Sequence, residues 1–294
     1  MSTAGPLDLV RRSVHRARRL HDPAPSRSAD ATAPLGWRER LDAASVLLRR
    51  REYVLFVSHM RSYSTVLGHI FGSHPEISGY VELHRSYDTP ADLRAMRLQV
   101  LRLNGDLDGR FVFDKLLHRR HEISDDILRR PSVHPIYALR EPVGATKSLI
   151  AMGRRHKTKR TWYQNPRRAA QHAINRYADL VRLADRCPDA AVMFTDCLLS
   201  DEAATLTGLT GYLGLRSPLT PEYQQFDKTA KGGFGDPVGP IKAGRVVADR
   251  PAHDVELPAG LEAKLLRAYE KTSTHLVRRC GVVVGEPSTP AGSG

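Results

Sequence analysis

Residues 53–73 read YVLFVSHMRSYSTVLGHIFGS, and this stretch decides the fold. Its first part, Tyr53 to Val57, is apolar and mostly β-branched or aromatic, which is typical of a buried parallel strand. Residues 58–64 are small, polar or basic, and from Thr65 apolar residues return at helical spacing. A strand that leads through a polar turn into a helix is typical of an anion site, because the first N–H groups of the helix face the turn without partners.

The strand-then-helix pattern recurs along the chain. Short apolar runs at 110–115, 134–139 and 190–195 alternate with segments of helical periodicity. This alternation predicts an α/β fold: a single P-loop-like domain with a central parallel sheet, flanked by helices on both faces. Ligands bind such sheets at the carboxyl ends of the strands. The residues that follow each predicted strand are therefore the candidates for a site.

Composition predicts three parts along the chain. Residues 1–36 are rich in Arg, Ala, Pro and Ser and predict a flexible basic arm. Residues 37–284 carry the alternating pattern and form the predicted α/β domain. Residues 285–294 are predicted to be a disordered tail.

The charge balance and the cysteines narrow the class of protein. Lys and Arg number 45 against 32 Asp and Glu, a net charge of +13, which favours a polyanionic partner or simply an Arg-rich surface. The three cysteines form no CxxC pair and indicate a reducing compartment. No apolar run approaches the ~18–20 residues of a membrane span, and no apolar segment of a secretory signal follows the N-terminal arginines. We therefore predict a soluble, cytoplasmic protein without a transmembrane segment.

Three of the four predicted strand ends carry a fixed cation. The first strand leads to Arg61, the second to Asp114-Lys115, and the third to Arg140, with Ser148 eight positions later in the next helix. The fourth ends at Asp196. A phosphate-rich cofactor bound across these ends would account for part of the positive charge.

Together these motifs resemble the sulfotransferase superfamily that uses 3′-phosphoadenosine 5′-phosphosulfate (PAPS). Residues 61–65 (RSYST) are similar to the R-S-G-S/T-T loop that cradles the 5′-phosphosulfate in that family. Residues 139–142 (LREP) with Ser148 match the family's spacing for the 3′-phosphate site. Residues 231–236 (KGGFGD) fit the family's K-G-x-x-G-D loop, which closes over the cofactor. Without the resemblance, these residues would be interpreted as a surface turn. The likeness spans roughly residues 53–240.

The resemblance implies a set of cofactor contacts and no metal, because cations and N–H groups can neutralise the donor. One departure concerns Tyr63, which stands where the family has glycine; if that position needs a positive φ, tyrosine would cost ~1–2 kcal/mol. A second is Ala230, where many relatives have Arg. The implied contacts are Arg61, Ser62, Tyr63, Ser64 and Thr65 at the 5′-phosphosulfate, Arg140 and Ser148 at the 3′-phosphate, and Lys231 and Gly232 over the cofactor.

An acceptor hydroxyl needs a general base, and two residues are candidates. Glu82 lies in residues 79–84 (GYVELH), which resemble a glutamate-bearing segment of bacterial members. His118 resembles the K-T-H segment of cytosolic members, displaced by one position. We favour Glu82, with His84 as its orienting or substrate-binding neighbour. Lys115 would steady the sulfuryl or bridging oxygens.

Two other classes of protein fit the sequence less well than a sulfotransferase. A P-loop kinase or NTPase needs G-x-x-x-x-G-K-S/T, and the loop after the first strand has neither the glycines nor the lysine. A nucleic-acid-binding protein would account for the charge, but aromatic residues are only 6% and no binding motif is present. We predict sulfuryl transfer from PAPS, with adenosine 3′,5′-bisphosphate (PAP) as product, to a hydroxyl or amine of a small molecule, glycan or glycolipid. The acceptor and the oligomeric state stay open, and the basic residues 154–160 suit either an acidic acceptor or a solvated rim.

Overall fold

The computed structural model describes residues 49–104, 107–155, 161–227, 229, 240–248 and 253–287. Its centre is a six-stranded sheet in the order β2-β3-β1-β4-β5-β6, and each neighbouring pair is parallel. The predicted α/β fold with a central parallel sheet is therefore confirmed. The strands are β1 (Glu52–Val57), β2 (Ile77–Ser78), β3 (Phe111–Leu116), β4 (Val133–Leu139), β5 (Ala191–Phe194) and β6 (Val282–Val284).

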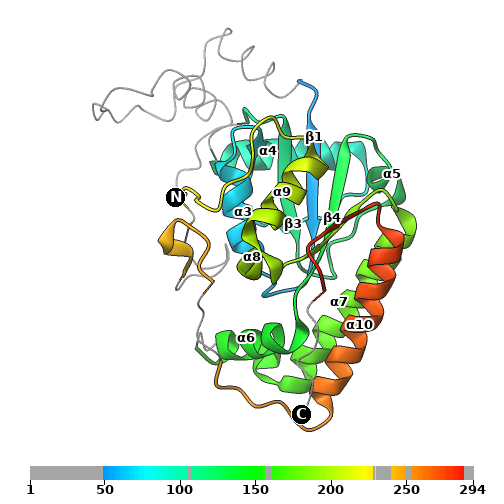
Figure 1. The fold of residues 1–294 in the computed structure, drawn as a ribbon. Helices are drawn as coiled ribbons and strands as arrows, with labels where there is room; N and C mark the ends of the chain where they lie inside the picture. The colour runs from blue at the N-terminus through cyan, green and yellow to red at the C-terminus, as the bar shows by residue number, and fades with distance from the viewer. Residues whose placement is uncertain are drawn as a thin grey trace.

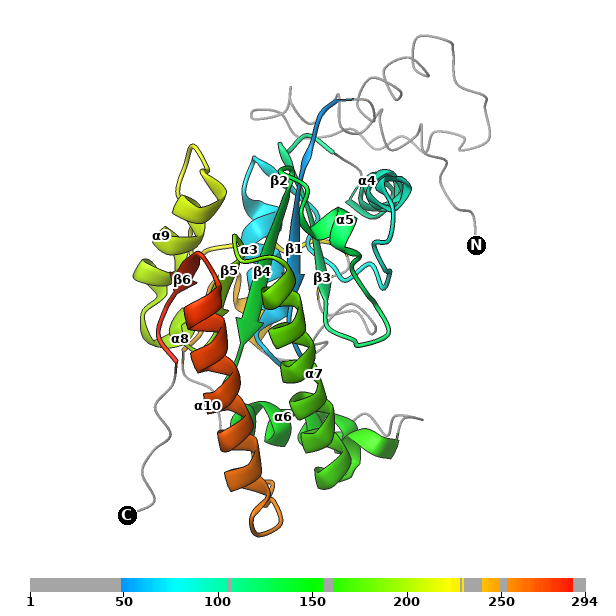
Figure 2. The same ribbon diagram turned by 90° about the vertical axis from the view of Figure 1, so that its right-hand side faces the viewer.

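Helices cover both faces of the sheet, as Figures 1 and 2 show. Three lie on one face: α3 (Ser64–Ser73), α8 (Cys197–Ser200) and α9 (Glu202–Leu213). Four lie on the other: α4 (Pro90–Asn104), α5 (Asp125–Leu128), α7 (Pro166–Arg186) and α10 (Leu261–Arg279). Of the α-helices in the described residues, α6 (Pro142–Arg155) lies on neither face but beyond the carboxyl ends of β1 and β4. Among the described residues, no helix combines the length and the apolar character needed to cross a membrane.

The strand β1 is buried on both faces, which is why its sequence shows no polar alternation. Val54 and Phe56 pack into the core beneath α3 and α9, with 0% of each side chain exposed. Tyr53, Leu55 and Val57 pack into the opposite core with α4, α7 and α10. The central strand thus joins the two hydrophobic layers, and burial of these side chains is the main stabilising term.

The predicted central strands are all present, with their ends shifted by one or two residues. The two edge strands, β2 and β6, were not predicted, because two and three residues respectively are too few for a visible periodicity. The predicted arm at 1–36 and the K-G-x-x-G-D segment at 231–236 lie outside the described residues.

The sheet topology brings three strand ends to one edge. The register pairs Val57 of β1 with Leu116 of β3 and with Tyr137 of β4. Arg176 of α7 closes this edge from one face: its Nε donates to the Ser58 carbonyl at 2.8 Å and its Nη2 to the Leu116 carbonyl at 2.6 Å. The loops after β1, β3 and β4 therefore start side by side.

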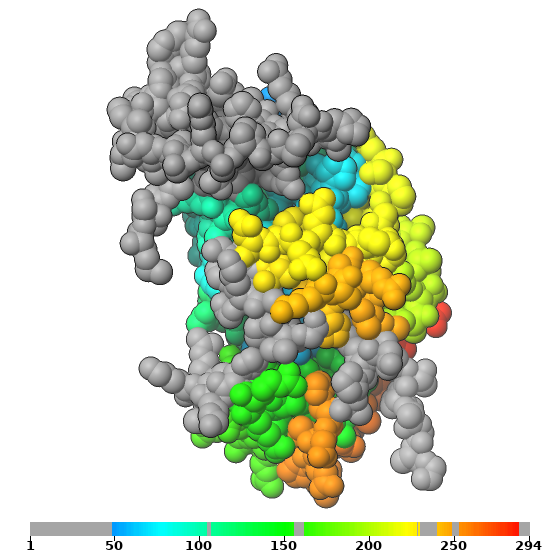
Figure 3. All heavy atoms as spheres, turned by 90° about the vertical axis from the view of Figure 1, so that its left-hand side faces the viewer, coloured from blue at the N-terminus to red at the C-terminus, as the bar shows by residue number. Residues whose placement is uncertain are grey.

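An irregular region covers α3 on the face shown in Figure 3, where residues 219–227 (yellow) and 240–248 (orange) lie together. The Tyr223 N–H donates to the Gly244 carbonyl at 2.7 Å, and the Gln224 N–H donates to Ser73 Oγ at 2.8 Å. The Thr229 hydroxyl lies 2.8 Å from Nε2 of His69 in α3. Both described ends of the segment that contains residues 231–236 are thus anchored near α3.

Candidate active site

The loop between β1 and α3 contains two residues in the left-handed region of backbone space. Arg61 has φ 64° and Tyr63 has φ 55°. Tyr63 is also the N-cap residue of α3 and makes no side-chain cap hydrogen bond. The position where the resembling family has glycine therefore does use a conformation that favours glycine, at a cost of ~1–2 kcal/mol for tyrosine.

The ring of Tyr63 lies against Arg140, which follows β4. The guanidinium carbon of Arg140 is 4.0 Å from the centre of the Tyr63 ring, within cation–π distance. Arg140 Nη1 also donates to the Arg61 carbonyl at 2.7 Å. The strained loop is thus tied to the end of β4 by a stacking contact and by hydrogen bonds from Arg140.

The two predicted phosphate regions meet at Ser148. Arg61 Nε donates to Ser148 Oγ at 3.0 Å, and Ser148 is 2% exposed in α6. The side chain that the resemblance assigns to the 5′-phosphosulfate therefore lies at the residue assigned to the 3′-phosphate. Of the remaining loop residues, Ser62 and Ser64 are buried and Thr65 is half-buried at the start of α3.

His59 and Asp196, which were not predicted as site residues, hold Arg140 in place. His59 Nε2 accepts the Arg140 N–H at 3.1 Å, and its Nδ1 lies 2.9 Å from the Met60 carbonyl, which fixes the tautomer with the proton on Nδ1. Burial lowers the pKa of His59 to about 3, so the ring is neutral. Asp196 accepts the Glu141 N–H at 2.6 Å and lies 3.6 Å from Arg140 Nε.

Glu82 and two histidines form a second cluster beside this loop. Glu82 is 9% exposed, with Oε1 3.2 Å from His84 Nδ1 and 3.8 Å from His118 Nε2. Burial raises the pKa of Glu82, but His84, His118 and Lys115 together shift it below its usual value. Burial also lowers the pKa of His118, so this imidazole is neutral near pH 7. Both candidate bases thus lie together.

Lys115 and Asp114 lie next to this cluster, at the end of β3. Lys115 is 2% exposed, and burial lowers its pKa to about 8, against the opposing effect of Glu82 and Asp114. Asp114 is fully buried and accepts hydrogen bonds from the Leu83 N–H at 2.8 Å and the Tyr87 hydroxyl at 2.6 Å. Asp114 therefore fixes the backbone that carries Glu82.

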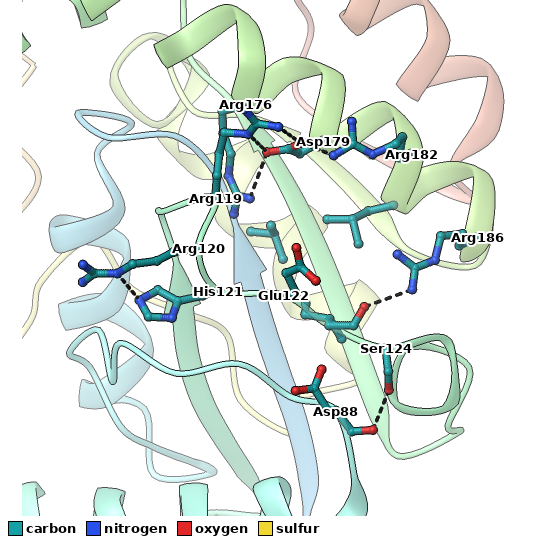
Figure 4. A pocket seen from close by; sticks show the side chains of 13 residues that line it. Asp88, Arg119, Arg120, His121, Glu122, Ser124, Arg176, Asp179, Arg182 and Arg186 are labelled. Carbon is teal, nitrogen blue, oxygen red and sulfur yellow. Dashed lines mark hydrogen bonds and ion pairs between the residues drawn. The ribbon is translucent and has the colours of Figure 1, made fainter.

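A cavity of about 660 Å³ lies between α7 and the loop that follows β3. Figure 4 shows Arg119, Arg176 and Arg182 converging on Asp179 at one end of it. At the other end, Arg120 Nε donates to His121 Nε2 at 3.0 Å. The His121 ring is 6.1 Å from that of His84, so the cavity adjoins the Glu82 cluster.

The structure thus gathers the predicted residues into two neighbouring groups. Lys231 and Gly232 lie outside the described residues. Sequence reasoning gave no role to His59, His121 or the Arg176–Asp179 pair, because each acts through a contact with a residue more than 30 positions away or on another element. For His59, its place at a strand end was the only available signal.

Comparison with known proteins supports the fold. No protein-family model and no curated protein sequence matches the chain. The solved sulfotransferase domain from the curacin biosynthetic pathway is similar with a TM-score of 0.54 and 17% identity, over 76% of this chain and 98% of that one. This chain therefore has the fold of a sulfotransferase domain. Two further solved structures are similar more loosely: the sulfotransferase domain of the Synechococcus PCC 7002 olefin synthase (TM-score 0.48, 16% identity, 76% of this chain and 95% of that one) and a sulfotransferase from Alicyclobacillus acidocaldarius (0.43, 14%, 79% and 96%).

Proposed function

We propose that this protein transfers a sulfuryl group from PAPS to a hydroxyl or amine of a small molecule, glycan or glycolipid. The observation that carries the proposal is the convergence of Arg61, Arg140 and Ser148, from three elements, at the carboxyl ends of β1 and β4. A sulfotransferase-type fold with cations at this edge suits a donor that carries two separated phosphates.

The residues present fit such a donor. Two buried polar groups at this edge, the Ser62 hydroxyl and Arg140 Nε, have no hydrogen-bond partner among the residues that the structure describes, although Arg140 Nε faces the Asp196 carboxylate at 3.6 Å. Unsatisfied buried donors are unfavourable unless a ligand accepts from them. Arg140 and Ser148 would hold the 3′-phosphate, and the first N–H groups of α3 with the hydroxyls of Ser64 and Thr65 would hold the 5′ end.

Arg61 would contact either the 3′-phosphate or the 5′-phosphosulfate of the donor. Its side chain contacts Ser148, whereas its backbone belongs to the loop assigned to the 5′-phosphosulfate. The hydrogen bond between Thr229 and His69 holds the chain two residues before Lys231 against α3. This anchoring supports a role for Lys231 and Gly232 in closing over the bound donor.

When bound, PAPS supplies the sulfuryl group and leaves as PAP. The protein's task is then to orient the acceptor in line, to take its proton and to neutralise charge on the leaving phosphate. Lys115 supplies a buried positive charge for the last of these. Glu82 and His118 form the proton-accepting pair: Glu82 is ionised, and His118 has a free lone pair near pH 7 because burial keeps it neutral. The neighbouring cavity of about 660 Å³ has room for a small acceptor.

Donor recognition is tested by comparing PAP with adenosine 5′-monophosphate. We expect PAP to raise the melting temperature clearly more than the monophosphate, because Arg140 and Ser148 bind the 3′-phosphate. Arg140→Ala with Ser148→Ala should remove most of that difference while leaving the response to the monophosphate in place. Equal stabilisation of the unaltered protein by both nucleotides would refute the assignment.

The base is tested by Glu82→Gln and His118→Asn, measured with labelled sulfate donor against a panel of acceptors. We expect Glu82→Gln to bind PAP as before and to lose on the order of 100-fold or more in turnover, because a general base typically contributes that much. Glu270→Gln, an exposed carboxylate on α10, is the matched control and should be unaffected. Near-normal turnover in Glu82→Gln with loss in His118→Asn would move the role to His118.

A further inference from the structure

Three side chains beside the proposed transfer site lie close enough together to approach one metal ion. Glu82, His84 and His121 each present one ligand atom, and these atoms all lie within 4.8 Å of one another. They come from two chain segments, residues 82–84 and the loop after β3, which meet only in the folded protein. The ring of His118 lies nearby. Its centre is 6.0 Å from that of the His84 ring and 6.3 Å from that of the His121 ring.

The carboxylate of Glu82 is buried beside two of these histidines. Its Oε1 lies 3.2 Å from His84 Nδ1 and 3.8 Å from His118 Nε2. A buried carboxylate is unfavourable unless a positive group compensates its charge. A cation bound between this oxygen and the neighbouring imidazole nitrogens would compensate that charge and bind the lone pairs of the rings at the same time.

We propose that Glu82, His84 and His121 bind a divalent transition metal of the zinc type. Imidazole nitrogens with one carboxylate oxygen suit zinc and cobalt, whereas calcium and magnesium prefer oxygen ligands alone. Tetrahedral bonds of ~2.0–2.1 Å place ligand atoms roughly 3.4 Å apart. The ligands must therefore move inward by about an ångström, and His84, 40% exposed, has room to do so.

Arg120 should weaken the binding of a metal at this site. Its Nε donates to His121 Nε2 at 3.0 Å, and its side chain is exposed. Metal binding at His121 must break that hydrogen bond and bring a cation next to a guanidinium. Removing the Arg120 charge should therefore strengthen metal binding, whereas removing the His121 ring should weaken it.

A metal at this site also occupies Glu82, the proposed base. If the proposed function holds, zinc should inhibit transfer, because a carboxylate bound to a metal no longer accepts the acceptor's proton. This consequence rests on the proposed function, whereas metal binding itself does not.

The site is tested with Co²⁺ as the probe, on the full chain after treatment with a chelator. We expect visible absorption of four- or five-coordinate cobalt at one equivalent, and its displacement by Zn²⁺. His121→Asn should weaken cobalt binding by at least the roughly tenfold that loss of an outer-shell partner of a metal ligand costs, and Arg120→Gln should tighten it. His275→Asn is the matched control, because His275 pairs with Asp185 elsewhere on the surface and should leave binding unchanged.

Two results would overturn the metal site: cobalt whose spectrum stays that of the free aqueous ion, or His121→Asn binding cobalt as the unaltered protein does. Activity is measured separately, with each variant's turnover in zinc divided by its own turnover without metal. Zinc should lower this ratio in the unaltered protein and much less in His121→Asn. A cobalt spectrum without any sulfuryl transfer would keep the metal site and refute the proposed function.

Discussion

Replacement of Tyr63 by glycine and by alanine tests whether this loop residue is strained. Both substitutions remove the ring that lies 4.0 Å from Arg140, so the loss of the cation–π contact, ~0.5–1 kcal/mol, is common to both. They differ at the backbone, since φ at this position is 55°. Alanine keeps the left-handed cost of ~1–2 kcal/mol, and glycine removes it.

Glycine carries an opposing term in the unfolded chain. Its greater freedom there costs about 0.5–1 kcal/mol relative to alanine. The difference between the two variants is therefore roughly 0–1.5 kcal/mol, centred near 0.8 kcal/mol, in favour of glycine, whereas alanine is the more stable of the two at an unstrained position. For a domain of this size that corresponds to a difference in melting temperature on the order of 2 °C.

The assay is thermal or urea unfolding of three variants under identical conditions. Tyr63→Gly should be more stable than Tyr63→Ala, and Tyr63→Phe, which keeps the ring and the backbone, should stay near the unaltered protein. An alanine variant more stable than the glycine variant by about 0.5–1 kcal/mol, the order at an unstrained position, would refute the strain. It would mean that the loop relaxes to a negative φ once the ring is gone.

Two further predictions concern the buried groups at the end of β3. Lys115→Met should lower turnover on the order of 100-fold or more, because it removes the proposed charge-stabilising cation. The melting temperature should change little, since the substitution also removes the cost of burying the ammonium group. Unchanged turnover would contradict the proposed role of Lys115. For Asp114, burial raises the folded-state pKa from 3.8 to about 7, so the folded protein binds more protons than the unfolded chain between those values, and this group's contribution to stability falls as pH rises through that range. Asp114→Asn should flatten that fall in a series of melting curves from pH 4 to pH 7, and parallel curves for the two proteins would contradict the shift.

Much of the fold was predictable because the central strands are buried on both faces. Burial leaves uninterrupted apolar runs, and those runs are visible without any knowledge of neighbours. The edge strands lacked this signal because they are short. Because these apolar runs are visible, their ends were predictable too, and with them the positions of Arg61, Lys115 and Arg140 at the strand ends.

The contacts between segments were not predictable, because they depend on which side chains the fold brings together. Nothing in the sequence indicates that Arg61 donates to Ser148, 87 positions away. The same holds for Asp114, whose raised pKa arises from complete burial that the sequence of a strand end does not imply. His121 reads as a surface histidine until the loop after β3 brings it next to His84.

Arg176 and Arg140, two cations at this edge of the sheet, differ in how many of their hydrogen-bond donors are used, and composition does not show this difference. Arg176 is 2% exposed and bonds two carbonyls as well as facing Asp179, so its charge is neutralised within the fold. Arg140 bonds the Arg61 carbonyl, stacks on Tyr63 and lies 3.6 Å from Asp196, yet its Nε makes no hydrogen bond among the described residues. A satisfied buried cation serves the fold, whereas one with an unused donor can still accept an anion. Both guanidiniums face a carboxylate at a similar distance, and it is therefore the unused donor, not an uncompensated charge, that supports the phosphate-binding role proposed for Arg140 rather than Arg176.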